Sequence, residues 1–230
     1  MEADSLIPSG TVLLAGALRS KLRRRGPLKS FASIALFCLC ACAASNAVEV
    51  PSLSERLASL RPKVRAAPAD ALPELDALAV EAPRDPWVLC VRAECLVLLG
   101  EWERVLADLD AALALDPSIP WAHYERGVAL GIVRGAAPSI EAFTRAIELD
   151  PRHYKAFAHR GDAHAQLSRY DEAEADFARS IECWPAGQDG AELARVHAFR
   201  ANALSNLGRD EEAQQALARC AELRRTAGGS

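Results

Sequence analysis

The chain has 230 residues, half of them apolar, and a formal net charge of −4 at pH 7. This length suits one repeat array or one to two globular domains. The first 50 residues hold six Lys or Arg against three Asp or Glu, whereas the rest hold 21 basic and 28 acidic residues, a net charge of −7. That balance argues against nucleic acid as a partner of residues 51–230.

Residues 1–47 have the layout of an export signal. A basic stretch at 19–29 precedes the uncharged apolar run FASIALFCLCACAA at 31–44, and small residues follow. This order is typical of a secretory signal peptide. Extending the run to Val48 gives 18 residues, near the lower limit for a helix that spans a bilayer. We therefore expect a signal peptide, a lipoprotein signal or a retained membrane anchor, and a segment unrelated to export is the remaining alternative.

Two processing sites compete within this segment. Leu39-Cys40-Ala41-Cys42 resembles a bacterial lipobox, which would make Cys42 the lipidated residue, although a cysteine at position 40 is unusual there. The residues 45–47, Ser-Asn-Ala, instead offer the small-x-small pattern of ordinary signal cleavage. Either route predicts an exported or membrane-associated protein, periplasmic or in the cell envelope if the source is bacterial. Contact with the membrane would involve this segment only.

Residues 48–85 are interpreted as a degenerate first repeat that caps the array described next. A leucine stripe at 53–60 is expected to be interrupted by Pro62 and Pro68 before helical spacing resumes at 71–80. The end units of repeat arrays are commonly atypical, because one of their faces meets water.

The chain then repeats itself every 34 residues. Each unit has the pattern of two amphipathic helices joined by a short polar turn, and in the unit at 154–187 these helices are expected at 154–167 and 171–181. A small residue facing a large one predicts close contact between the helices. Three kinds of residue recur at this spacing: closing prolines (Pro117, Pro151, Pro185), small residues (Ala93, Gly127, Gly161) and large apolar residues (Leu109, Phe143, Phe177).

This pattern resembles the tetratricopeptide repeat, a 34-residue helix-turn-helix unit with small, aromatic and closing-proline positions. We expect four such units, at 86–119, 120–153, 154–187 and 194–225, followed by a disordered tail at 226–230. The resemblance implies an all-α, right-handed superhelical solenoid of antiparallel helix pairs. It also implies a non-catalytic scaffold for protein–protein interaction.

In this family, the first helices of successive units line a concave groove. Such a groove would grade here from aromatic and apolar to polar along the chain, which suits a helix or an extended peptide of a partner protein. The alternative is that its two tryptophans only pack against the preceding repeat. Carried over by position, the groove residues are Trp87, Cys90 and Glu94, then Trp121, Tyr124 and Val128, then Lys155, Asp162 and Gln166, and finally Arg195, Asn202 and Asn206.

A more specific ligand of the family is not expected. Some members bind chaperone C-terminal carboxylates with a clamp of lysines, asparagines and arginine from three consecutive units. At the corresponding places this chain has Cys90, Glu94, Glu125 and His159, and only Lys155 matches the clamp.

An arginine precedes the small residue of every first helix and could form a basic ladder for an acidic ligand. Its place beside the buried stripe favours a structural role instead, in which the arginine pairs with a carboxylate of a second helix. These arginines are Arg92, Arg126, Arg160 and Arg200.

No catalytic, cofactor or metal site is expected. The chain contains no glycine-rich phosphate loop, nucleophile elbow or HExxH motif. His159 and His164 are five residues apart, whereas a spacing of three or four would place two ligands on one helix face.

The last helix, expected at 210–225, suggests an alternative function. Its apolar stripe is interpreted as larger than one neighbouring helix can cover, so that a second copy of the chain or a partner helix could bind there. Self-association, as a structural element of an envelope complex, is therefore the alternative to a partner-binding scaffold. A patch small enough for water to tolerate is the other possibility. The stripe consists of Ala213, Ala216, Leu217, Cys220 and Leu223.

Overall fold

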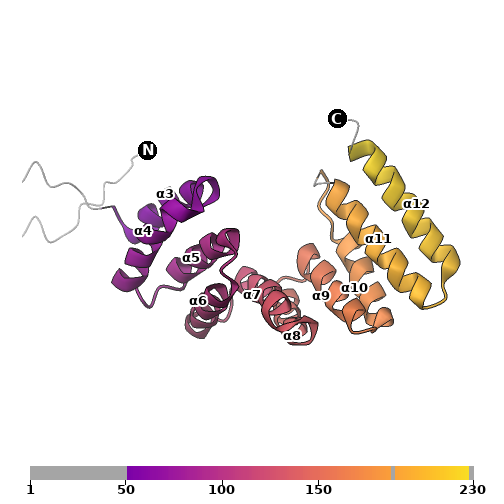
Figure 1. The fold of residues 1–230 in the computed structure, drawn as a ribbon, viewed down its shortest axis with the longest axis horizontal. Coiled ribbons are helices and arrows are strands. Elements are labelled where there is room, and N and C mark those ends of the chain that lie inside the picture. Colours follow the sequence, from indigo (N-terminus) through magenta and orange to yellow (C-terminus); the bar gives the residue numbers. More distant parts are fainter. Residues whose placement is uncertain (1–50, 188–189, 228–230) are drawn as a thin grey trace, which may run out of the picture. The chain divides into compact units, whose positions relative to one another are not determined.

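The computed structural model describes residues 51–187 and 190–227 (Figure 1). Within these ranges the chain forms ten α-helices and no strand. The expected signal or anchor segment, with Cys42, lies outside the described residues, as does most of the tail at 226–230. In chain order the helices are α3 (Leu53–Ala66), α4 (Pro68–Glu81), α5 (Pro86–Leu99), α6 (Trp102–Leu115), α7 (Pro120–Arg134), α8 (Ala136–Leu149), α9 (Tyr154–Gln166), α10 (Tyr170–Glu182), α11 (Gly190–Asn206) and α12 (Asp210–Ala227).

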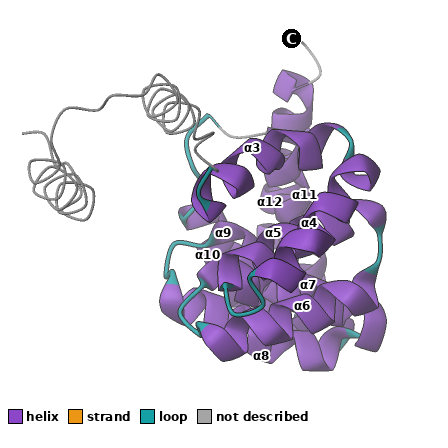
Figure 2. Cartoon of the chain, turned by 90° about the vertical axis from the view of Figure 1, so that its left-hand side faces the viewer, coloured by secondary structure: helices purple, strands orange, loops and turns teal. Residues whose placement is uncertain are grey.

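Successive helices pair into hairpins. The pairs are α3 with α4, α5 with α6, α7 with α8, α9 with α10 and α11 with α12, and the second helix of each hairpin also packs on the first helix of the next. Figure 1 shows the pairs following one another in chain order, and Figure 2 shows only helices and loops in the part that is described. The expected all-α solenoid of antiparallel helix pairs is therefore confirmed.

Local sequence signals set the helix ends. The Ser52 hydroxyl accepts a hydrogen bond from the Glu55 N–H, and the Glu55 carboxylate accepts one from the Ser52 N–H, which caps α3. Asp85 caps α5 by accepting from the Trp87 N–H at 2.8 Å. Gly100 ends α5 with a φ of 74°, a left-handed conformation that costs glycine little. These residues determine where α3 begins and where α5 begins and ends.

The expectation for Pro62 is wrong, because α3 continues through this residue instead of ending before it. Proline has no N–H to donate to the carbonyl of Ala58, four residues earlier. Ala58 and Pro62 are both exposed, so water can bind that carbonyl in place of the missing donor. Pro68 behaves as expected, since α3 ends before it and α4 begins at it.

The insertion before the last hairpin is partly helical. Helix α11 begins at Gly190 instead of at residue 194, because Ala191 and Glu192 are residues that favour a helix. The added turn places Glu192 three residues before Arg195, so that both side chains lie on one face of α11.

The recurring small residues lie where an aromatic ring contacts the first helix of a hairpin. A Cβ atom at Gly127 would lie 2.6 Å from the Phe143 ring. A Cβ atom at Gly161 would lie 3.0 Å from the Phe177 ring and 3.2 Å from the carbonyl oxygen of Ala173. These distances are shorter than a side chain tolerates, so the two helices can approach this closely only because both positions are glycine.

The recurring arginines join neighbouring helices. Arg92 donates two hydrogen bonds to Asp108 on α6, at 2.8 and 2.6 Å, and one to Asp76 on α4, at 3.1 Å. Arg160 repeats the double bond with Asp176 on α10, at 2.8 and 2.7 Å. Two parallel bonds to one carboxylate fix the geometry of such a pair. The structural interpretation of these arginines is confirmed, since the other two also bind second-helix carboxylates, Arg126 with Asp110 and Arg200 with Glu174.

The substitution Gly161→Leu is expected to lower the free energy of unfolding by about 1–3 kcal/mol, because the added side chain forces the Phe177 ring or the helix axis to move. Urea denaturation of the full chain measures this change. The matched control is Gly131→Leu on α7, where a Cβ atom would lie 3.8 Å from its nearest neighbour, the Ser139 Cβ. The control should unfold at the wild-type midpoint or above it. An unchanged midpoint for Gly161→Leu would contradict the packing of these hairpins.

Candidate protein-binding groove

The two tryptophans expected in the groove differ in their surroundings. Trp87 on α5 is 49% exposed. Trp121 on α7 is partly buried against the core cluster that joins α5, α6 and α7. The groove interpretation therefore suits Trp87, and packing against the preceding repeat describes Trp121.

Cys90 does not present a surface to a partner. Its side chain is only 3% exposed and belongs to the same core cluster as Leu89 and Ala93. Burial raises the pKa of the Cys90 thiol to about 12, so it stays protonated. The family resemblance implied that this position faces the groove. In this chain it belongs to the contact between hairpins, so Cys90 is not a groove contact residue. Glu94, one turn later, is half-buried and pairs with Arg65 of α3 at 3.6 Å.

A cavity of about 240 Å³ lies between α7, α8 and α9. Its floor exists because Gly127 and Gly131 have no side chains, and Ile132, 55% exposed, stands at its edge. Three of the expected groove residues contribute to its walls. The lining from α7 and α8 comprises Gly127, Val128, Gly131, Ile132, Ala136, Ser139 and Phe143, and the lining from α9 comprises His159, Asp162, Ala163 and Gln166. We call it the glycine cavity.

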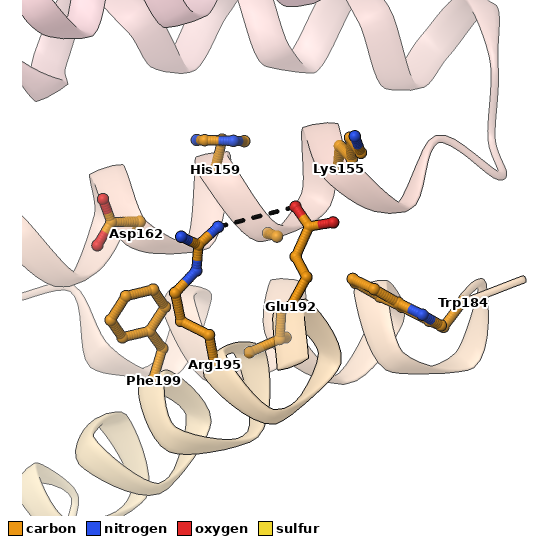
Figure 3. Close-up of a pocket in the computed structure, with 9 residues that line it drawn as sticks. Lys155, His159, Asp162, Trp184, Glu192, Arg195 and Phe199 are labelled. Atoms are coloured by element: carbon orange, nitrogen blue, oxygen red, sulfur yellow. Dashed lines mark ion pairs between the residues drawn. The ribbon is translucent and has the colours of Figure 1, made fainter. Parts of the chain in front are cut away.

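A second cavity, of about 190 Å³, lies between α9 and α11. Figure 3 shows Glu192 and Arg195 projecting from α11 toward His159 on α9, with the rings of Trp184 and Phe199 on either side. Arg195 and Glu192 form an ion pair at 3.7 Å. The expected residues Lys155, Asp162 and Arg195 all line this cavity, together with Ala158, His159, Trp184, Glu192, Val196 and Phe199.

Sequence reasoning missed several residues of these cavities. His159 lines both of them, as does Asp162, so α9 forms a ridge between the two. His159 and Phe199 each occupy the sixth position of their unit. In the unit at 154–187 this position directly follows Ala158 and lies three residues before the expected groove residue Asp162. Helix periodicity puts that position on the same face as the positions that we carried over, and this signal could have found them.

Tyr124 forms part of the wall between α7 and α9. Its ring centroid lies 4.8 Å from that of His153, 5.6 Å from that of His159 and 6.1 Å from that of Phe143. Burial raises the pKa of the Tyr124 hydroxyl and lowers the pKa of both histidines. These side chains are therefore uncharged near neutral pH and act as apolar walls.

Glu125, the next residue on α7, is a half-buried carboxylate. Burial raises its pKa to about 7; the charge of Glu94 raises it further, and Lys155 opposes the shift. Among the described residues, none forms a hydrogen bond or an ion pair with the Glu125 side chain. On the α7 face that carries Val128, this carboxylate is therefore desolvated and is not paired by any of the described residues.

The polar end of the expected groove lies apart from both cavities. Asn202 and Asn206 are exposed, and the Asn206 amide donates to the Asn202 carbonyl oxygen at 2.8 Å. Neither residue lines either cavity. The cavities therefore gather residues from the middle of the expected series.

The apolar stripe of the last helix is smaller than expected. Ala213, Ala216 and Cys220 are buried, and Leu223 is half-buried. Leu217 alone of the five stripe residues is open, with 53% of its surface exposed. The contact with α11 therefore covers more of the stripe than the sequence suggested, because alanine and cysteine side chains need little area to be buried.

Residues 51–187 and 190–227 contain neither a cluster of metal-ligating side chains nor a helix suited to crossing a membrane. No group of three or more His, Cys, Asp or Glu side chains is placed to hold a metal ion there. No helix in these ranges is both long enough and apolar enough to span a membrane.

The substitution Glu125→Gln is expected to stabilise the protein more at high pH than at low pH. The folded-state pKa of about 7 exceeds the ordinary glutamate value of about 4.3. The contribution of the protonated Glu125 carboxyl to stability is therefore fully present below about pH 4.3 and is lost as the pH rises through about 7. Glutamine has no such loss. The difference in melting temperature between variant and wild type should grow from about pH 5 to about pH 8.

Glu211→Gln on α12 is the control for this measurement, because the Glu211 side chain is exposed. The difference in melting temperature between Glu211→Gln and wild type should not grow from about pH 5 to about pH 8. If the difference in melting temperature between Glu125→Gln and wild type did not change between these pH values, burial of an unpaired carboxylate at position 125 would be disproved.

Comparison with known proteins supports the repeat interpretation. Residues 154–182 and 194–226 match the family model described as the tetratricopeptide repeat. Among curated proteins, anaphase-promoting complex subunit 3 of Schizosaccharomyces pombe is 29% identical over 103 residues, which are 45% of this chain and 16% of that protein. The chain therefore corresponds to a small part of this relative.

Solved structures with much lower sequence identity share the fold. The crystal structure of MamA is 16% identical and superposes with a TM-score of 0.67 over 79% of this chain and 99% of MamA. YrrB, described as a TPR protein with an unusual peptide-binding site, is 17% identical and superposes with a TM-score of 0.58 over 69% of this chain and 78% of YrrB. The chain thus contains tetratricopeptide repeats and has the fold of tetratricopeptide repeat proteins.

Proposed function

We propose that this protein is a non-catalytic scaffold that holds a peptide or helix of a partner protein across α7, α9 and α11. The observation that carries the proposal is the pair of neighbouring cavities on either side of α9, with His159 and Asp162 between them. Ile132 and Phe199, both substantially exposed, stand beside these cavities. Cavities with apolar edges and a few polar groups suit the side chains of a bound segment.

The geometry fits a segment that crosses α9. Packed helices are separated by about 8–10 Å, so side chains about that far apart could enter both cavities. Three residues of an extended chain, or two turns of a helix, span about 10 Å. The peptide-binding site named for YrrB, a protein of the same fold, adds support.

Self-association has less support than partner binding. The stripe on α12 that motivated it retains only Leu217 as a well exposed residue of the five. A single leucine provides far less apolar area than a stable homodimer buries. We therefore favour a groove that binds a different protein.

The substitution Gly131→Leu should abolish partner binding and leave the fold intact. The new side chain would occupy the glycine cavity, whereas its Cβ meets no atom closer than 3.8 Å. The test is selection of octapeptides from a randomised phage library on the full chain, followed by affinity measurement of the selected peptides. Affinity should fall at least tenfold in the variant, while the melting temperature stays at or above that of wild type.

The matched control is Ser205→Leu, an exposed position on α11 that lines neither cavity. This variant should keep the wild-type affinity. Full affinity in Gly131→Leu would show that the glycine cavity is not part of the binding surface.

We further propose that the protein is exported or tethered to a membrane through residues 1–47. The support is the sequence alone, with basic residues at 19–29 followed by the apolar run at 31–44. A bacterial lipoprotein signal would attach lipid to Cys42.

The substitution Cys42→Ser separates the two routes of export. In cells fed a labelled fatty acid, the wild-type chain should carry the label and the variant should lose it if the protein is a lipoprotein. Simple secretion predicts no label in either chain and a shortened protein that begins near Val48. A full-length protein that stays in the cytosol would contradict export and tethering together.

A further inference from the structure

The Glu125 carboxylate faces charged groups from the helices on both sides. On α5, Glu94 repels it, although Arg65 partly neutralises Glu94 at 3.6 Å. On α9, Lys155 attracts it, yet the two do not form an ion pair in the described structure. The adjacent Tyr124 on α7 remains uncharged because burial raises its pKa. Glu125 is thus the half-buried anion of the groove that the described residues do not pair.

An unpaired half-buried carboxylate is unfavourable, and the fully buried aspartates of the described structure avoid this state. The carboxylates of Asp108 and Asp176 are similarly or more deeply buried, and each accepts two hydrogen bonds from an arginine. A cationic side chain of a bound partner would pair with the Glu125 carboxylate in the same way. No cluster of three metal-ligating side chains surrounds it among the described residues, so a single ammonium or guanidinium group fits better than a metal ion.

The glycine cavity lies along the same face of α7. Val128 and Ile132 follow Glu125 by three and seven residues, which are close to whole helical turns, and both line the cavity. Three to seven residues of helix advance about 5–10 Å. Two to three residues of an extended chain advance about 7–10 Å. A segment bound along α7 could therefore place one side chain on Glu125 and another in the glycine cavity.

We propose that the groove selects partner segments in which a lysine or arginine that pairs with Glu125 lies two or three residues from a large apolar side chain that fills the glycine cavity. This inference rests on the proposed scaffold function and names the chemistry of its partner. It assigns a basic ligand to Glu125, because Arg65 pairs with Glu94 and Arg195 pairs with Glu192, whereas Lys155 does not form an ion pair with Glu125 in the described structure.

Binding of this kind is coupled to proton release. With a pKa of about 7 in the free protein, Glu125 is mostly protonated at pH 6 and mostly ionised at pH 8. If the cation binds only the ionised form, affinity rises about tenfold over this range. Burial lowers the pKa of the His159 imidazole, which favours its neutral form.

The first test compares peptide selection on the wild-type full chain and on Glu125→Gln, with Glu211→Gln as the control. Octapeptides selected at pH 8 on wild type and on the control should be enriched in Lys or Arg at one position, two or three residues from Leu, Ile, Met or Phe. Those selected on Glu125→Gln should keep the apolar residue and lose the basic one.

The second test measures the affinity of one selected peptide between pH 6 and pH 8. Wild type should bind about tenfold more tightly at pH 8, and calorimetry in two buffers of different ionisation enthalpy should detect the released proton. The same peptide with norleucine in place of its basic residue should bind with an affinity that does not change with pH.

The possible outcomes distinguish this inference from the scaffold proposal. Selected peptides that are neutral or acidic, or a basic preference that survives in Glu125→Gln, would overturn the inference and leave the scaffold standing. A library that yields no peptide above the background without protein would overturn both. A pH-independent affinity for the basic peptide would also overturn the assignment of the cation to Glu125.

Discussion

The fold depends on a double contact made by the second helix of each hairpin, which packs on its own partner and on the first helix of the next hairpin. Phe143 and Phe177 sit in this contact, and their rings reach the backbone of the partner helix because Gly127 and Gly161 have no side chains. A hairpin alone would leave such apolar surface in water. Stacking buries it and makes each unit depend on its neighbours.

The same contact determines where a ligand could bind. The two cavities on either side of α9 are lined mainly by first helices, α7, α9 and α11. Gly127 and Gly131 on α7 show the two consequences. A Cβ at Gly127 would strike the Phe143 ring, whereas one at Gly131 would make only an ordinary contact with Ser139 at 3.8 Å. One glycine therefore permits packing, and the other leaves room for a side chain from outside.

Buried aspartates in the helix contacts are paired with arginines, whereas the half-buried Glu125 is not paired among the described residues. Arg92 and Arg160 each bind a buried aspartate of the second helix in the same hairpin with two hydrogen bonds, so the contacts within these hairpins contain compensated charges. Glu125 has no such partner among the described residues, and its pKa is raised accordingly. A cost of this kind, retained one helical turn from Val128 of the glycine cavity, is what a binding site for a cation would require.

The sequence by itself determined the features that repeat. The 34-residue period predicted the helical hairpins, the small residues opposite aromatic rings, and the pairing of arginines with carboxylates, because each depends on spacing within one or two neighbouring units. Only the tertiary structure decided the burial of Cys90 and the desolvation of Glu125. These depend on distances between helices that are far apart in the sequence, and periodicity carries no information about such distances.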